Sequence, residues 1–334
     1  MDILIKSFNR PYYLARCIQS IYDNVLDEAL SITVLDDGTP KKYLQKIKFK
    51  YPDVKILLSD FYQVKSESIG KENYTEISGI PIDFWLDAAR NASDYFLLLE
   101  DDIWFTQKIN LRETNEIMIQ DNIYFLKLFW LNNQKLIYGK TKKVKNQMLV
   151  YEPSVFAKNP LLHRLIFGIT RFGNRKMMQL LNLYSEDRAL NYYSIYGVAG
   201  AIFKKEYFLN LWHDHKNLVD ENLQIINAVK FWSQNPEMQF ARTTSEYLAT
   251  GFSSSATNKF FNPNQFDVFA FNKLLNDAWL ADEIDVFDNL PDDLNDLKVK
   301  EILLKSKHKN VKMEDWVKWV DIFKKQFQDI GCKI

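Results

Sequence analysis

The first hundred residues alternate between short apolar runs and stretches with helical spacing, and this alternation restricts the chain to a small group of folds. Buried strands are predicted at 2–8, 31–37, 53–59 and 94–102. Helices are predicted between them at 11–25, 41–51 and 81–92. Strand and helix in turn at this spacing indicate an α/β protein with a mostly parallel sheet covered by helices.

The remainder of the chain has a less regular pattern. A further buried strand is predicted at 122–131, and the lysine-rich stretch 135–147 is expected to form a solvated loop or hairpin. Residues 196–212 predict a strand followed by a helix, and another helix is predicted from Asp220 onward. From about residue 266 the spacing is helical, which predicts a helical C-terminal region.

Charge and cysteine content exclude some classes of protein. Lys plus Arg and Asp plus Glu each number 43, so net charge gives no reason to expect a nucleic-acid partner. Cys17 and Cys332 lie far apart, which argues against a disulfide framework. The chain opens without a secretory leader and has no apolar run near the roughly 20 residues that span a bilayer, so a cytoplasmic protein is expected.

Acidic residues follow two of the predicted strands. Glu100, Asp101 and Asp102 come directly after an apolar run, and Asp36 and Asp37 end an earlier strand. Ligands of open α/β sheets bind at the carboxyl ends of the strands, so we expect both groups of acids to face one crevice.

Aspartates in such a place are suited to a hard divalent cation, Mn²⁺ or Mg²⁺. Three adjacent acids repel one another, and no Lys or Arg is close to them in the sequence, so a cation would relieve that repulsion. The alternative is an acidic loop that solvates the strand end or caps the next helix.

Several motifs then occur in a fixed order: ILIKSFNRPYYLARCIQSI, ITVLDDGTP and AARNASDYFLLLEDD. In this order they resemble the opening of GT-A fold glycosyltransferases, closest to family 2. Two later stretches, VAGAIFKKEYF and VDENL, resemble the family more loosely. The resemblance implies a GT-A (Rossmann-like) sheet flanked by helices, with a nucleotide-sugar-binding half at 1–105, an acceptor-binding half at 106–262 and a helical extension at 263–334.

The resemblance also implies roles for individual residues. The donor-binding residues would be Ser7, Phe8, Asn9, Asp36, Asp37, Arg90 and Asp101. Asp37 would accept a hydrogen bond from the base, Asp102 would bind the metal directly, and Asp220 would be the catalytic base. Phe8 stands where the family has Tyr and Val219 where it has Glu, so the base, the stereochemistry and the sugar stay open.

Each of these residues has a simpler structural alternative. Asn9 could cap the helix that begins at Pro11, and Asp36 and Asp37 could be ordinary turn residues before Gly38. Arg90 could form a surface ion pair, and Asp220 could cap a helix.

The implied activity is metal-dependent transfer of a sugar from a nucleotide diphosphate sugar, UDP-linked, to a hydroxyl of a glycan or lipid-linked acceptor, with inversion. The alternative is a protein of the same fold that binds nucleotide sugars without catalysis. A nucleotidyltransferase is disfavoured, because no glycine-rich loop follows the first strand.

The stretch 161–184 suggests a membrane contact. Its apolar residues Leu162, Leu165, Ile166, Ile169 and Phe172 share one helical face, and Arg164, Arg171 and Arg175 form a basic stripe. Such a helix can lie on an anionic membrane surface. The alternative is an ordinary helix that packs on the domain, and Gly168 and Gly173 weaken a long continuous helix.

Overall fold

The computed structural model describes residues 1–72, 79–168, 172–216, 218–257, 266–306, 308–309 and 311–334. The chain divides into two compact units. Unit 1 comprises Met1–Asp2, Trp85–Leu98 and Asn110–Glu246. Unit 2 comprises Ile3–Phe84, Leu99–Ile109 and Tyr247–Ile334. The division falls inside strand β4 (Tyr95–Glu100), so that strand contributes to both units.

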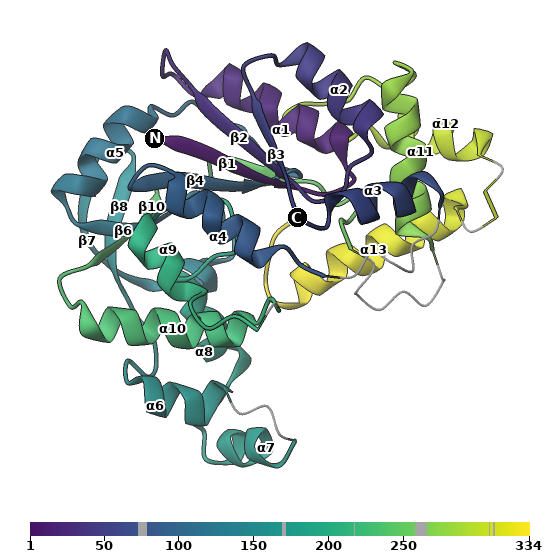
Figure 1. The fold of residues 1–334 in the computed structure, drawn as a ribbon. Coiled ribbons are helices and arrows are strands. Elements are labelled where there is room, and N and C mark those ends of the chain that lie inside the picture. Colours follow the sequence, from purple (N-terminus) through teal and green to yellow (C-terminus); the bar gives the residue numbers. More distant parts are fainter. Residues whose placement is uncertain (73–78, 169–171, 217, 258–265, 307, 310) are drawn as a thin grey trace. The chain divides into compact units, whose positions relative to one another are not determined.

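Unit 2 is built on the strands predicted near the start of the chain. β1 (Asp2–Ser7), β2 (Ser31–Asp36) and β3 (Lys55–Leu58) lie side by side in the order β3-β2-β1-β4 (Figure 1). β2 and β3 are parallel. Helices α1 (Pro11–Asn24) and α2 (Lys41–Lys50) connect them, and α3 (Tyr62–Gly70) follows β3. The predicted strands and helices of this region are confirmed, whereas α3 falls in a polar stretch for which no helix was predicted.

The C-terminal helices complete the core of unit 2. They are α11 (Val268–Leu280), α12 (Asp296–Lys305) and α13 (Met313–Asp329), and a short antiparallel pair, β5 (Ile103–Phe105) with β11 (Leu248–Thr250), precedes them. The hydroxyl of Tyr13 on α1 donates to Asp293 over 2.7 Å, and buried Arg16 donates to two carbonyls before α12. The helical C-terminal region is therefore confirmed, and it packs against the first helices of the chain. The functional division at residues 105 and 262 stays a prediction.

Unit 1 contains a mixed set of strands in the order β4-β9-β6-β10-β8-β7. Their bounds are β6 (Ile123–Lys127), β7 (Gly139–Lys145), β8 (Met148–Pro153), β9 (Ala201–Lys204) and β10 (Gln239–Thr243). β9 runs antiparallel to both of its neighbours, β10 is parallel to β6, and β7 and β8 form a hairpin. The α/β class is thus confirmed, and the hairpin confirms the prediction for the lysine-rich stretch.

Helices flank these strands of unit 1. They are α4 (Ile82–Asn91), which lies mainly in this unit, α5 (Leu111–Gln120), α8 (Glu186–Leu190), α9 (Lys205–Leu211) and α10 (Glu221–Gln234). Short 3-10 turns occupy Gln134–Ile137 and Asn191–Ile195. The aromatic side chains of Phe96, Phe203 and Phe208 meet between β4, β9 and α9 with ring centroids 5.3–6.1 Å apart. This aromatic packing forms a core for unit 1 that is made of its own residues.

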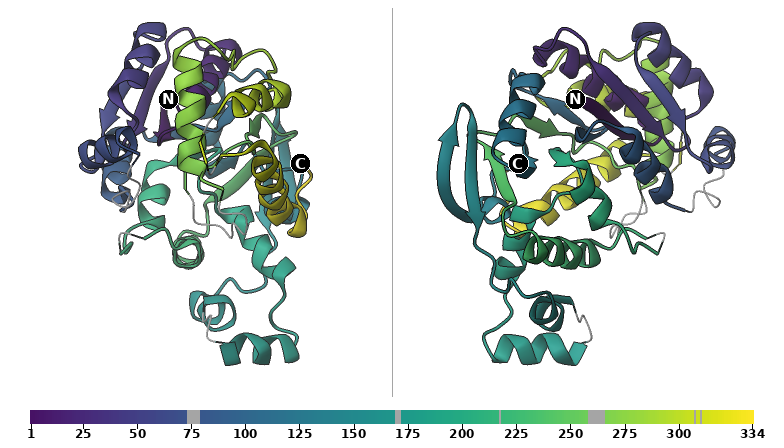
Figure 2. Two further views of the ribbon diagram at one scale, coloured as in Figure 1. Left: turned by 90° about the vertical axis from the view of Figure 1, so that its right-hand side faces the viewer. Right: turned by 60° about the vertical axis from the view of Figure 1, so that its left-hand side comes forward.

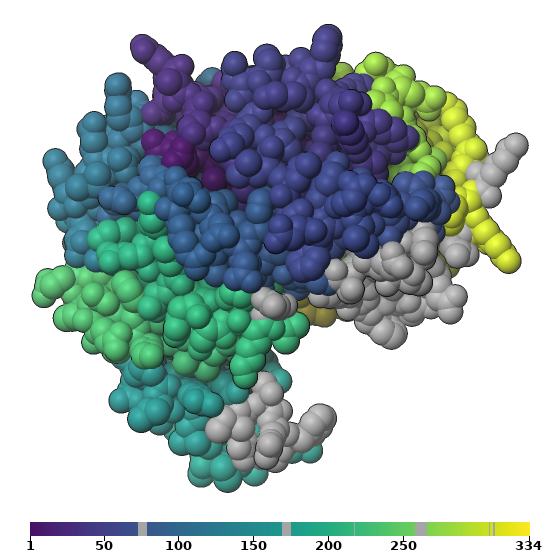
Figure 3. All heavy atoms as spheres, in the orientation of Figure 1, coloured from purple at the N-terminus to yellow at the C-terminus, as the bar shows by residue number. Residues whose placement is uncertain are grey.

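The stretch 161–184 is not one helix. α6 (Pro160–His163) continues into a π-helical turn (Arg164–Gly168), and α7 (Phe172–Leu180) follows. Ile169, Arg171 and the side chain of Phe172, which belong to the predicted amphipathic pattern, lie outside the described residues. Both views of Figure 2 show α6 and α7 extending away from the rest of unit 1, and they protrude in the space-filling view as well (Figure 3). Among the described residues, no helix combines the length and apolar character needed to cross a bilayer.

Candidate functional site

The acids predicted to face a crevice meet at adjoining strand ends in unit 2. The amide of Asp37, after β2, donates to the carbonyl of Ser7 at the end of β1 over 3.0 Å. The amide of Asp101, after β4, donates to the carbonyl of Lys6 over 2.9 Å. Three strand ends therefore lie next to one another, and both groups of acids belong to the same end of the sheet.

Each acid of the Glu-Asp-Asp run has a cationic partner. Lys6 Nζ lies 2.8 Å from Glu100 Oε1. The buried guanidinium of Arg10 spans the other two acids: Nη1 lies 2.7 Å from Asp102 Oδ2, and Nη2 contacts Asp101 Oδ1. Protein cations therefore relieve part of the repulsion for which the sequence suggested a bound cation. The partners come from β1 and the turn after it, more than ninety positions away in the sequence.

Burial sets the protonation of this cluster. Burial raises the pKa of Asp101 to about 7, although Arg10 acts in the opposite direction. Burial also raises the pKa of Asp102 above its ordinary value. The pKa of Glu100 is lowered, because Lys6 outweighs the effect of burial there. A cation bound at this strand end would favour the ionised form of the two aspartates and reverse part of the effect of burial.

One carboxylate oxygen fits a metal ion. Asp102 Oδ1 is buried and has no hydrogen-bond partner among the described residues, while its other oxygen accepts from Arg10. No group of three or more His, Cys, Asp or Glu side chains in the described part of the chain is arranged to hold a metal. The site thus suits a cation that takes one or two carboxylates from the protein and the rest of its ligands from substrate phosphates and water, as Mg²⁺ commonly does.

Asp36 holds the turn after β2. Its Oδ1 accepts from the amides of Gly38 and Thr39 over 3.0 and 2.8 Å, and its Oδ2 accepts from the Thr39 hydroxyl over 2.6 Å. Burial raises its pKa to about 6, and these hydrogen bonds act in the opposite direction. Gly38 has a φ of 140°, and a Cβ there would lie 2.6 Å from Cβ of Lys65 and 3.2 Å from the ring of Phe8. The turn therefore requires glycine, and it brings Phe8 and Lys65 close to the backbone.

Lys65 is a member of the site that sequence reasoning missed. Its ammonium pairs with Asp37, donates to the carbonyl of Gly79 over 2.7 Å, and lies 5.4 Å from the centroid of the Phe8 ring. Asp37 also accepts from the Ser59 hydroxyl, and burial raises its pKa. A lysine inside a polar stretch carries no sequence signal of this pairing, and only the position of α3 places it there.

Asn9 does not cap α1, so that alternative is wrong. The N-cap position is Arg10, which makes no capping hydrogen bond with its side chain. Asn9 has a φ of 54°, its amide donates to the Thr39 hydroxyl over 2.9 Å, and its Oδ1 accepts from Asn276 over 3.1 Å. The loop after β1 is thereby tied to the turn after β2 and to α11.

Two predicted residues belong to unit 1. Asp220 is exposed and caps α10 by accepting from the amide of Leu223 over 3.1 Å. Next to it, Glu221 accepts from the hydroxyl of Tyr193. Arg90 pairs with Asp87 one turn away on the exposed side of α4. These contacts match the simpler structural alternatives for both residues, and their roles toward a donor or acceptor stay predictions.

Comparison with known proteins finds similarity in structure only. No protein-family model matches the chain, and the curated proteins include no match. The crystal structure of S. aureus TarS 1–349 with UDP-GlcNAc is 14% identical, covers 97% of this chain and 80% of that one, and has a TM-score of 0.43. Glucosyl-3-phosphoglycerate synthase from Mycobacterium tuberculosis, with Mn²⁺, UDP and phosphoglyceric acid, is 12% identical over 82% and 77% of the two chains at a TM-score of 0.37.

The galactosyltransferase LgtC, with donor and acceptor sugar analogues, is 12% identical over 69% of this chain and 70% of that one, at a TM-score of 0.34. Similarity at this level says nothing about the chemistry of the present chain, which has to be argued from its own residues.

Proposed function

We propose that this chain is a glycosyltransferase that moves a sugar from a nucleoside diphosphate sugar, UDP-linked, to a hydroxyl of a glycan or lipid-linked acceptor. The observation that supports the proposal most is the half-buried carboxylate of Asp102, whose Oδ1 atom is buried. It lies at a strand end, one of its oxygens is held by Arg10, and the other has no partner among the described residues. A buried oxygen of this kind is costly unless a ligand or an ion completes it.

The donor nucleotide would lie over the ends of β1 and β2. Phe8 offers a ring to the base, and Asp37 offers an acceptor to its N–H group. Both oxygens of Asp37 already accept from Ser59 and Lys65, but a carboxylate has lone pairs for further donors. Asp36 keeps the turn in place through its hydrogen bonds to Gly38 and Thr39.

A divalent cation, Mn²⁺ or Mg²⁺, held by Asp102 with Asp101 beside it, would stabilise the negative charge of the departing diphosphate. Arg10 holds both carboxylates and fixes their direction. In the transfer, the bond between the sugar's anomeric carbon and the diphosphate oxygen breaks, and the diphosphate leaves with the electron pair. The acceptor oxygen forms the new bond, and its proton passes to a carboxylate base, for which Asp220 is proposed. A single displacement of this kind inverts the anomeric carbon.

One observation favours the second candidate, a protein that binds nucleotide sugars without catalysis. Arg10 already pairs with both Asp101 and Asp102, so part of their negative charge is compensated without a cation. Such a site would bind a donor equally well with and without Mn²⁺. Turnover, and the dependence of binding on Mn²⁺, separate the two candidates.

The test is a thermal-shift screen of nucleoside diphosphate sugars with and without Mn²⁺, followed by assays of donor hydrolysis and transfer. The proposal expects a UDP-sugar to raise the unfolding temperature more strongly with Mn²⁺, and Asp102→Asn to abolish that increment. Asp321→Asn, at an exposed aspartate of α13, is the matched control and should behave as wild type. Unchanged Mn²⁺ dependence in Asp102→Asn would show that the metal assignment is mistaken.

A further inference from the structure

Unit 1 carries two adjoining hollows whose lining residues have no part in the proposed reaction. One has a volume of about 290 Å³ and is lined by β7, the end of β8, the end of α10 and the start of β10. The other, of about 600 Å³, continues along β7 and the segment after β8. They share Glu152, Pro153 and Lys158, and an ion pair of 2.9 Å between Lys158 and Glu152 lies where they meet. We call the two hollows together the lysine groove.

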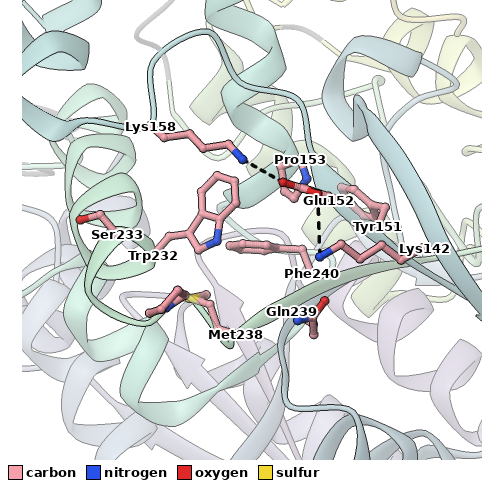
Figure 4. Close-up of a pocket in the computed structure, with 11 residues that line it drawn as sticks. Lys142, Tyr151, Glu152, Pro153, Lys158, Trp232, Ser233, Met238, Gln239 and Phe240 are labelled. Carbon is pink, nitrogen blue, oxygen red and sulfur yellow. Dashed lines mark hydrogen bonds and ion pairs between the residues drawn. The ribbon is translucent and has the colours of Figure 1, made fainter.

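Aromatic rings line both parts of the lysine groove. Trp232 stands between the ammonium of Lys158, which lies 4.9 Å from its ring centroid, and the ring of Phe240, 5.3 Å away and nearly perpendicular (Figure 4). In the second hollow, exposed Phe156 lies under the guanidinium of Arg188 at 4.3 Å. Large aromatic side chains that stay accessible in a hollow mark a binding surface, because burying them against a ligand removes apolar area from water.

Positive charges predominate in the lysine groove. The described residues that line it include the cations Lys140, Lys142, Lys158 and Arg188 and a single carboxylate, Glu152. Lys142 and Lys158 both approach that carboxylate, at 3.9 and 2.9 Å, so it neutralises only part of their charge. An excess of positive charge in a hollow attracts anions.

We propose that the lysine groove binds a stretch of a negatively charged glycan. Sugar rings would lie with their C–H faces on Trp232 and Phe156, and carboxylate or phosphate groups between the rings would pair with the lysines and Arg188. This inference rests on the proposed function, since it takes the ligand to be a distant part of the acceptor chain. It names the acceptor class as an anionic glycan.

The position of the groove within unit 1 suits such a role. The groove includes Gln239, the first residue of β10, with Met238 before it, and Pro153, the last residue of the antiparallel β8. Active-site crevices of open α/β sheets form at the carboxyl ends of parallel strands, and β6 and β10 both begin at this end. Within unit 1 the groove therefore lies at the amino ends of these two parallel strands.

The test is electrophoresis of the native protein through gels that contain a polysaccharide, with retardation as the measure of binding. Polygalacturonate supplies carboxylates, a phosphomannan supplies phosphates, and dextran is the neutral comparison. We expect retardation by one or both anionic polymers, weaker at high salt, and none by dextran. The anionic polymer that retards the protein identifies the charged group that the groove recognises.

Variants connect the binding to the groove. The double variant Lys142→Gln/Lys158→Gln changes two exposed side chains and should weaken binding about 10-fold. Trp232→Ala should weaken it by a similar factor. Lys230→Gln, at an exposed lysine on the same helix as Trp232 that does not line the groove, is the matched control and should bind as wild type. Thermal unfolding of each variant identifies any that has lost its fold. If Trp232→Ala has lost its fold, the binding of the lysine double variant alone decides the test.

The inference would be overturned by no retardation by either anionic polymer, by equal retardation by dextran, or by unchanged binding in the lysine double variant. Equal binding of a single-stranded oligodeoxynucleotide, lost in the same variants, would also overturn it and indicate a general polyanion site. The thermal shift with UDP-sugars, measured on the same proteins, keeps the two proposals apart. If the wild-type protein binds donor but no glycan, only the proposal for the groove is contradicted. If it binds glycan but no donor, the proposed reaction is contradicted.

Discussion

The strand ends of unit 2 and the lysine groove of unit 1 are both held by ion pairs, but in opposite surroundings. The side chains of Arg10 and Asp101 are 5% and 1% exposed, whereas those of Lys158 and Glu152 are 54% and 46% exposed. Arg10 also has two carboxylates to neutralise, and Glu152 has two lysines. The same chemical groups therefore form a fixed structural element in one unit and an accessible surface in the other.

The difference in burial determines how much it costs to break each set of ion pairs. A buried ion pair is already desolvated, so removing one partner leaves an uncompensated charge in the interior. An exposed pair in water contributes little to stability, because solvent screens it. The lysines of the groove can therefore exchange Glu152 for a ligand at small cost, whereas Arg10 cannot leave its aspartates without loss of structure.

The largest expected effect follows from removing Arg10. Arg10→Met should lower the free energy of unfolding of the protein by about 3–5 kcal/mol, because buried Asp101 and half-buried Asp102 lose their partner. Lys158→Met, the matched change in the groove, should lower the stability of unit 1 by no more than about 1 kcal/mol. Chemical denaturation followed by tryptophan fluorescence and circular dichroism measures both. Equal losses in the two variants would contradict the comparison.

An exposed acid can also be essential for chemistry without stabilising the fold, and Asp220 tests this. Asp220→Asn should reduce turnover at least about 100-fold, or about 2.7 kcal/mol, by removing the proposed base. Stability should be nearly unchanged, because Asn caps a helix about as well as Asp does. Steady-state kinetics with saturating donor measures the first quantity and thermal unfolding the second. Near-normal turnover would assign the role instead to Glu221, Asp187 or another acid.

Unit 1 also contains a buried titratable group, His163, which makes stability depend on pH. His163 packs against the rings of Phe167 and Tyr192, and burial lowers its pKa to about 4. Between this value and about 6.5, the pKa of an unfolded histidine, the unfolded chain binds more protons, so stability falls as the pH falls. From pH 7 to pH 5 the loss should be about 2 kcal/mol.

Chemical denaturation of the full chain at several pH values measures this loss. His163→Phe, which suits the aromatic surroundings, should remove most of it. His213→Phe, at an exposed histidine, should leave it unchanged. A profile that stays the same in His163→Phe would show that another group titrates.

The smallest expected effect concerns the protruding α6–α7 segment. Leu161 and Leu180 are 78% and 88% exposed, so packing within unit 1 accounts for Ile166, which is buried, but not for these leucines. Arg175 pairs with Glu186 and contributes less positive charge than the sequence suggested. We therefore expect weak binding to anionic vesicles at low salt.

Co-sedimentation with vesicles of anionic phospholipid measures this binding. Leu161→Gln/Leu180→Gln should abolish it, and Leu304→Gln, at another exposed leucine, on α12, should not. Wild-type protein that stays in the supernatant at low salt would favour a purely structural segment.

Much of the fold in the first hundred residues was predictable, because alternation of strand and helix is recorded locally in the sequence. The same alternation placed Asp36, Asp37, Asp101 and Asp102 at strand ends, and in the structure these strand ends adjoin. α3 and β10 were not predicted. α3 has almost no apolar side, and β10 is a short strand whose neighbours in the sequence are mostly polar. Neither segment therefore shows a clear hydrophobic periodicity.

The partners of the acids could not be predicted from spacing. Arg10 lies 91 and 92 positions from Asp101 and Asp102, and Lys65 lies 28 positions from Asp37. Such pairs depend on how strands are ordered in the sheet, which local patterns do not record. The lysine groove was missed for the same reason, because Trp232 and Lys142 belong to segments that only the sheet brings together.

The lysines of β7 have a consequence for the solubility of the protein. β7 ends the strand order of unit 1, and a terminal strand presents unpaired backbone groups to which another chain can add. Lys140, Lys142, Lys143 and Lys145 are spread along this strand, and their mutual repulsion opposes the approach of a second copy. A variant that replaces all four would therefore risk forming fibrils or precipitates before its ligand affinity could be measured.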